Sequence, residues 1–253
     1  MGRLPAPVPH DLPRPAAAAR GGARAGSTLG AVVHLALRAF FDLPQAERTP
    51  RAAARLVDRY WNSEGFRDAD QAAEYRERAR GWMADYVAEL DPDAEPVAVE
   101  RWVSVATDRI VAEGRVDRID RRGTELVVVD YKTGRRTPTP ADTASSQALA
   151  LYAVAVERTL RRRCTQVELH HLPSGTVAAW RHDEASRREH VTRAESSAAE
   201  LDTASDELAA GGPADALFPP RPGPRCGSCD VRRHCPEGRA AAPEEVPWAG
   251  LAP

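Results

Sequence analysis

The stretch VVVDYKTGRR, residues 127–136, contains Lys132, the only lysine of a 253-residue chain whose 35 lysines and arginines are otherwise all arginine. Lysine carries a compact charge on a flexible stem, whereas arginine presents a wide planar fork. Three valines precede Asp130, and the two-residue period of a strand places Asp130 and Lys132 on one face of a sheet. The stretch predicts a buried strand that ends in a carboxylate and an ammonium. The alternatives are a chance survivor of an arginine-rich composition and a simple ion pair on an edge strand.

A second carboxylate is expected from the preceding strand. The segment GRVDRID, residues 114–120, carries Asp117 and is joined by a short turn to the strand that ends at Asp130. Adjacent antiparallel strands can place two carboxylates within reach of one ion, and Mg²⁺ takes one or two carboxylates together with waters and phosphates. A bound metal activates water, and Lys132 would position that water or stabilise charge on a phosphoryl oxygen. Asp120 lies near the turn and is interpreted as solvated.

The remaining pattern predicts an α/β domain with a central mixed sheet flanked by helices. Expected helices cover residues 27–43, 50–61, 70–90, 146–160 and 185–208, and expected strands cover 97–106, 109–120, 125–133, 166–172 and 176–183. We interpret residues 1–26 as a disordered or truncated leader, 27–215 as the catalytic domain with its N-terminal helical region, 216–240 as a cysteine-rich metal-cluster segment and 241–253 as a flexible tail.

Composition bounds the location and the partners. The formal net charge of −2 gives no bulk argument for nucleic acid, so any basic surface must be local. No apolar run is long enough to cross a membrane, and no signal peptide opens the chain. Four cysteines without a secretory signal indicate a reducing, cytoplasmic compartment, where clustered thiols favour a metal over disulfides.

The cysteines form a second constellation. Cys226, Cys229 and Cys235 follow one another closely in a loop rich in proline and glycine, which predicts a metal centre. Cys164 opens an expected strand and is interpreted as a small core residue. A zinc site would need another donor, because His234 is adjacent to Cys235 and neighbouring residues rarely bind one tetrahedral ion.

The motifs together resemble a known family. GRVDRID, VVDYKTG and QALALYA occur in the order and spacing of the PD-(D/E)XK nuclease superfamily, and the likeness is strongest to its RecB-like exonuclease branch, which includes AddB-type nuclease domains. It spans about residues 27–236. The resemblance implies a restriction-endonuclease-like fold and an Mg²⁺- or Mn²⁺-dependent DNA nuclease of repair or recombination.

The same resemblance implies roles for individual residues. His34, in the pattern GAVVH, would bind metal together with Asp117, Asp130 and the backbone carbonyl of Tyr131, and Lys132 would be the catalytic lysine. Taken alone, a histidine on an apolar helix face is usually a core or boundary residue.

Two further residues come from the helix motif. Gln147 and Tyr152 would lie along DNA or support the site, although relatives commonly space them four apart and here the spacing is five. The resemblance also implies a [4Fe-4S] cluster on the three clustered cysteines and a fourth cysteine near the N-terminus. No cysteine precedes Cys164, so either Met1 lies downstream of the true start or the cluster is incomplete, and zinc remains the alternative.

Arginines gather where DNA should pass. Arg115, Arg118, Arg135 and Arg136 are predicted to bind phosphates without reading sequence, the alternative being a solvated arginine surface. Glu100 could join the acidic face but is interpreted as a solvated edge carboxylate.

The sequence therefore predicts a metal-dependent DNA nuclease, acting as an exonuclease on single strands or ends. No GxxxxGK[ST] loop occurs in the chain, so unwinding would require a helicase partner. The alternatives are a catalytically weak DNA-end-binding subunit with an iron-sulfur or zinc structural site, and a zinc-ribbon scaffold.

Overall fold

The computed structural model describes residues 22–91, 93 and 95–253, so most of the predicted leader lies outside the described residues. The chain divides into two compact units. The larger unit contains residues 23–219 and 246–253, and the smaller unit contains residues 220–245.

The larger unit begins with three helices, α1 (Ala25–Phe41), α2 (Pro50–Tyr60) and α3 (Ala69–Ala88). Thr49 caps α2, because its side chain accepts the N–H of Ala52, and Pro50 occupies the first helical position. The Asp68 side chain caps α3 in the same way. The 3-10 helix η1 (Gln45–Glu47) lies between α1 and α2.

Five strands form one sheet, in the spatial order of the sequence. They are β1 (Ala98–Ala106), β2 (Val111–Arg122), β3 (Glu125–Lys132), β4 (Cys164–His171) and β5 (Thr176–Arg181). Strands β3 and β4 are parallel, and the other neighbouring pairs are antiparallel. The parallel pair requires a crossover, which α4 (Pro140–Ser145) and α5 (Gln147–Leu160) supply. The mixed sheet flanked by helices is confirmed.

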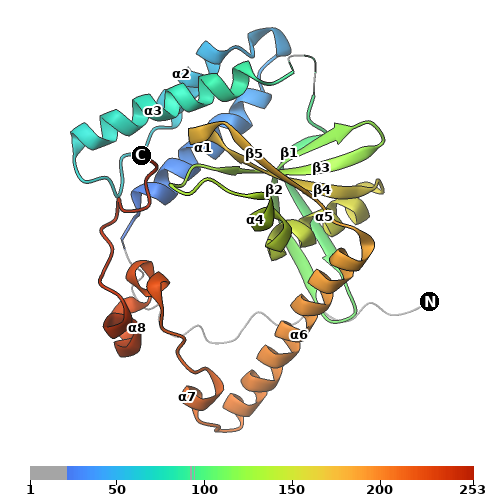
Figure 1. Ribbon diagram of the computed structural model, residues 1–253, viewed down its shortest axis with the longest axis vertical. Helices are drawn as coiled ribbons and strands as arrows, with labels where there is room; N and C mark the ends of the chain where they lie inside the picture. The colour runs from blue at the N-terminus through green and yellow to red at the C-terminus, as the bar shows by residue number, and fades with distance from the viewer. Residues whose placement is uncertain (1–21, 92, 94) are drawn as a thin grey trace. The chain divides into compact units, whose positions relative to one another are not determined.

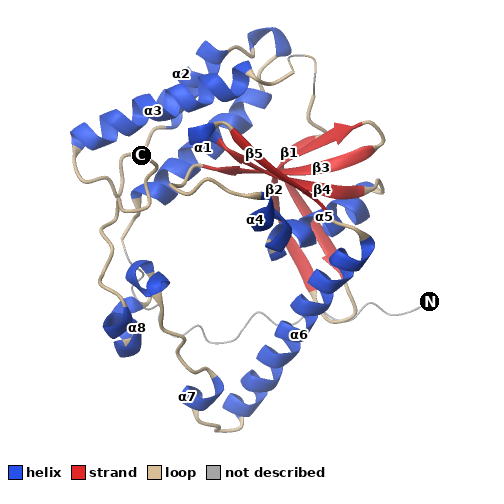
Figure 2. Cartoon of the chain, in the orientation of Figure 1, coloured by secondary structure: helices blue, strands red, loops and turns tan. Residues whose placement is uncertain are grey.

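Alternate residues of β3 pack in two different hydrophobic cores, one on each face of the sheet. Val127 and Val129 pack in the core shared with α1, α2 and α3, whereas Leu126 and Val128 pack in the core shared with α5. Helices therefore cover both faces of the sheet (Figures 1 and 2). Because β3 is buried on both faces, its sequence is an apolar run and not an alternation.

The elements that follow complete the two units. In the larger unit these are η2 (Leu172–Ser174), α6 (Glu184–Ala209) and α7 (Ala214–Leu217). The smaller unit contains η3 (Pro224–Ser228), η4 (Arg232–His234) and α8 (Pro236–Ala241). None of the helices in the described part of the chain is both long and apolar enough to span a membrane.

The C-terminal residues require a correction. Residues 246–253, expected as part of a flexible tail, pack in the larger unit. Pro247 O accepts the N–H of Ala25 at 3.1 Å, and Tyr75 Oη donates to Ala252 O at 2.6 Å. Leu251 is buried and forms a bridge with Gly134, two residues beyond Lys132. The segment is ordered because its apolar end enters the core beside α1.

Candidate active site

Three side chains from separate elements converge at one end of the sheet. His34 of α1, Glu100 of β1 and Asp117 of β2 each place one potential ligand atom within 4.8 Å of the other two. His34 Nδ1 lies 3.4 Å from Asp117 Oδ1 and 3.9 Å from Glu100 Oε1. An imidazole with two carboxylates is a donor set that fits a divalent cation such as Mn²⁺.

Glu100 has an unusual backbone. Its φ is +51°, in the left-handed region, although it lies within β1. The register pairs Val99 with Arg118 and Arg101 with Val116, so Glu100 stands opposite Asp117. Such a conformation costs a non-glycine residue of the order of 1–3 kcal/mol and redirects the side chain. The strain therefore aims the Glu100 carboxylate at His34 and Asp117.

The structure corrects the interpretation of Glu100 as a solvated edge carboxylate. Its side chain is only 9% exposed, and Arg115 Nε approaches Oε2 at 2.7 Å, so it is not a solvated edge carboxylate. Burial raises the pKa of Glu100, Arg115 opposes this effect, and the charge of Asp117 adds to it. The sequence carried one usable signal, an acidic residue on the strand expected next to the one that carries Asp117.

Asp117 is held by the neighbouring strand. Its Oδ2 accepts the N–H of Tyr131 at 2.8 Å, which leaves Oδ1 turned toward His34. The Tyr131 ring in turn meets the His34 ring edge-on, with centroids 5.8 Å apart. The residue between Asp130 and Lys132 therefore orients two of the expected metal ligands.

Asp130 and Lys132 form an ion pair through Oδ2 and Nζ, as expected for two residues on one face of a strand. Burial raises the pKa of Asp130, the charge of Lys132 lowers it, and the charge of Asp117 raises it further. The pKa of His34 is raised as well, because Asp117, Asp130 and Glu100 together outweigh the opposing effect of burial. The carboxylates of the site therefore raise one another's pKa, and a divalent cation would relieve this repulsion.

The structure separates the two residues of the helix motif. Tyr152 contacts Gly114 so closely that a Cβ there would lie 2.6 Å from a ring atom. Burial raises the pKa of Tyr152, and the charges of Asp130 and Asp117 raise it further, so its hydroxyl belongs to the same electrostatic environment. Gln147 instead pairs with His190 of α6, with Oε1 and Nδ1 3.1 Å apart. A spacing of five turns the two side chains about 140° apart around α5, whereas a spacing of four leaves them about 40° apart.

The predicted DNA-binding arginines do not all reach the surface. Arg115, Arg135 and Arg136 are exposed, and Arg136 also pairs with Asp142 in the capping box of α4. Arg118 is 3% exposed, and its Nε lies 2.9 Å from Asp120 Oδ1. A guanidinium enclosed in this way cannot bind a phosphate, so Arg118 is removed from the DNA-binding set.

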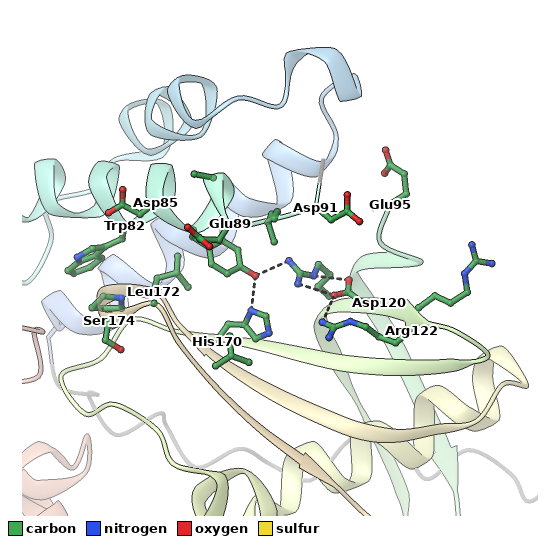
Figure 3. A pocket seen from close by; sticks show the side chains of 18 residues that line it. Trp82, Asp85, Glu89, Asp91, Glu95, Asp120, Arg122, His170, Leu172 and Ser174 are labelled. Carbon is green, nitrogen blue, oxygen red and sulfur yellow. Dashed lines mark hydrogen bonds and ion pairs between the residues drawn. The ribbon is translucent and has the colours of Figure 1, made fainter. Parts of the chain in front are cut away.

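Arg118 belongs to a group of mostly buried side chains that we call the Arg118 network. It consists of Arg118, Asp120, Tyr86, Tyr131, His170, Glu168 and Arg122. Part of it lines a cavity of about 780 Å³ between α3, β2 and η2 (Figure 3). None of the residues of the candidate active site lines this cavity, and the network groups bind one another. This cavity is therefore not where the chemistry is expected.

The smaller unit brings two cysteines together around Gly238. Cys226 Sγ accepts the N–H of Gly223 at 3.4 Å, and Cys235 Sγ accepts the N–H of Gly238 at 3.2 Å. A Cβ at Gly238 would lie 3.2 Å from Cys235 Sγ and 3.5 Å from Cys226 Sγ, so glycine leaves space beside both sulfurs. Backbone N–H groups directed at sulfur suit metal-bound thiolates. Cys229 is exposed within the same short segment.

Cys164 has the structural role predicted for it. It is fully buried at the start of β4, and burial raises the pKa of its thiol to about 12. A thiol that stays protonated is a poor nucleophile, and Cys164 packs in the core shared with α5.

Comparison with known proteins gives one family. Residues 11–236 match the family described as the PD-(D/E)XK nuclease superfamily. No curated protein matches the chain.

Proposed function

The match covers most of the chain, so the protein belongs to the PD-(D/E)XK nuclease superfamily of metal-dependent nucleases, and we propose that it is a RecB-like DNA exonuclease of repair or recombination. The observation that carries the proposal is the convergence of His34, Glu100 and Asp117 beside the Asp130–Lys132 pair.

The chain's own residues would divide the work as follows. His34, Asp117, Asp130 and the carbonyl of Tyr131 would hold Mg²⁺ or Mn²⁺. Of these, His34 and Asp117 each have a potential ligand atom within 4.8 Å of one on Glu100, which faces the same space. The cation, when bound, lowers the pKa of a water and neutralises charge on the phosphate.

Lys132 would act on the reacting atoms. Its half-exposed ammonium can hydrogen-bond the attacking water or the phosphoryl oxygen on which charge develops. Water adds to phosphorus, one ester P–O bond breaks, and the products are a phosphate and a hydroxyl end. An arginine fork would be too wide to share that water.

Substrate binding would be electrostatic and independent of sequence. Arg115, Arg135 and Arg136 are exposed near the candidate site and would bind phosphates. With a net charge of −2, the chain has no general attraction for DNA, so these local cations would set the affinity.

We further propose that Cys226, Cys229 and Cys235 ligate a [4Fe-4S] cluster completed by a donor outside this set, with zinc as the alternative. The N–H groups directed at two of the sulfurs support either metal. Iron and sulfide in a brown preparation would favour the cluster, and a colourless preparation containing zinc would favour the alternative. Substituting all three cysteines with serine should abolish metal retention.

A second candidate is a DNA-end-binding subunit with little catalysis that works with a helicase. The hydrogen bond between Gln147 and His190 favours this second candidate, because a side chain held by His190 would not be available to contact DNA.

One experiment separates the two functions. Mn²⁺-dependent degradation of labelled single- and double-stranded DNA is compared for wild type, Lys132→Ala and Arg51→Ala, an exposed cation of α2 that serves as the control. We expect Lys132→Ala to lose about 10²- to 10³-fold in rate, by analogy with removing a donor to a developing oxyanion. Inert wild type that still binds DNA ends would support the second candidate.

A further inference from the structure

The β1–β2 hairpin has one covered face and one open face. Val103, Val105 and Val116 point into the core shared with α5. The side chains on the other face are exposed, and they are Trp102, Ser104, Ala106, Val111, Glu113 and Arg115. This open face adjoins the candidate active site, because Arg115 Nε lies 2.7 Å from Glu100 Oε2.

Trp102 is not used to stabilise the fold. Its side chain is 64% exposed, and among the large apolar side chains described only Val111, at 67%, is more exposed. Neither residue belongs to the hydrophobic cores. Tryptophan is on average highly buried, so an indole open to solvent on a well-formed strand indicates another use.

The position of Trp102 connects it to the site. In the β1–β2 register it stands directly opposite Arg115, and the Arg115 guanidinium contacts Glu100 at 2.7 Å. Two residues along a strand correspond to about 7 Å. The Arg115 guanidinium therefore contacts a carboxylate of the candidate site, and Trp102 is the cross-strand neighbour of Arg115.

This combination fits an unpaired nucleotide. Proteins bind single strands by stacking bases on aromatic side chains beside a cation that contacts the backbone. The bases inside a duplex are already stacked on one another and offer no free face to an indole. Glu113 and Ser104 occupy the next cross-strand pair, so the open face is not uniformly basic and stacking would dominate there.

We propose that Trp102 is a stacking platform for an unpaired base beside the scissile phosphate, and that it makes this nuclease selective for single-stranded DNA. The inference rests on the proposed nuclease function and adds a specificity-determining residue to it. Arg115 would hold the adjoining phosphate.

The test measures DNA binding without cleavage. Fluorescence anisotropy with a labelled oligothymidylate and a blunt hairpin duplex, in Ca²⁺, compares wild type with Trp102→Ala, Trp102→Phe and Trp180→Ala. Trp180 is the matched control, since it is 43% exposed on the edge strand β5. We expect Trp102→Ala to weaken single-strand binding about 5- to 150-fold, Trp102→Phe to retain most of the affinity, and Trp180→Ala to bind like wild type.

Two further comparisons identify stacking as the cause. Abasic sites in the oligonucleotide should weaken wild type and leave Trp102→Ala nearly unaffected. The affinity ratio of wild type to Trp102→Ala should stay constant as salt increases, because stacking releases no counterions. Equal losses on single strand and duplex, unchanged binding, or conversion of an oligomer to a monomer by Trp102→Ala would overturn the proposal.

The same proteins are then assayed for cleavage in Mn²⁺. If wild type cleaves and Trp102→Ala matches it in binding and cleavage, the stacking role of Trp102 is contradicted and the nuclease function is supported. If wild type does not cleave but Trp102→Ala still loses single-strand binding, the stacking role of Trp102 is supported and the nuclease function is contradicted.

Discussion

Strands β2 and β3 carry two polar clusters that differ in charge balance. The candidate active site is crowded with carboxylates, and burial raises the pKa of both Asp130 and Glu100. Most side chains of the Arg118 network are buried, and Arg122 is exposed. Burial there would raise the pKa of Glu168, but His170 and Arg122 outweigh it, and the pKa is lowered.

The difference shows how a functional cluster can be distinguished from a structural one. In the Arg118 network each charge meets an opposite partner, so it needs nothing from outside. In the candidate active site the carboxylates also have cationic neighbours, but burial and the charge of Asp117 still raise the pKa of both Asp130 and Glu100, and this repulsion between carboxylates favours cation binding. The two clusters are joined, because the Tyr131 hydroxyl accepts from Arg118 at 3.1 Å and the Tyr131 N–H holds Asp117.

Among these predictions, the largest loss of stability is expected for Arg118→Met. Removing one partner of a buried pair leaves Asp120 without its main partner, and we expect a loss of about 3–5 kcal/mol in the free energy of unfolding. Urea denaturation measures it, with the exposed neighbour Arg121→Met as the control, expected to change stability by less than about 0.5 kcal/mol. Equal effects of the two substitutions would mean that burial does not distinguish Arg118.

Asp130→Asn tests the candidate active site. Burial and the charge of Asp117 disfavour the charged form of Asp130, so an amide there should raise the melting temperature of the metal-free protein by about a few degrees. The stabilisation by Mn²⁺ seen in wild type should disappear, since a cation stabilises only the fold that binds it. Differential scanning fluorimetry with and without Mn²⁺ measures both effects. A lower metal-free melting temperature would show that Asp130 is a structural partner of Lys132.

Glu168→Gln gives the smallest effect and concerns pH. The folded pKa of Glu168 lies below its unfolded value, so its contribution is present above the unfolded pKa, about 4.3, and is lost as pH falls through the folded pKa. Wild type should therefore lose more stability than the variant on acidification below that value. Urea midpoints across this range measure the difference, and parallel curves would contradict the assignment.

Much of the fold followed from local pattern. The valine run of β3, its turn to β2 and the shared face of Asp130 and Lys132 all rest on periods of a few residues. The helices α1 and α5 and the core position of Cys164 were predicted for the same reason. The match of residues 11–236 to the superfamily agrees with the order of these motifs.

The sequence by itself determined the strands, the order of the elements and the residue types available for metal chemistry, because these depend on neighbours along the chain. Only the tertiary structure decided that Glu100 turns into the site, that Arg118 is buried, that Gln147 binds His190 and that residues 246–253 pack beside α1. Each of these depends on contacts between residues far apart in sequence, and no local period encodes such contacts.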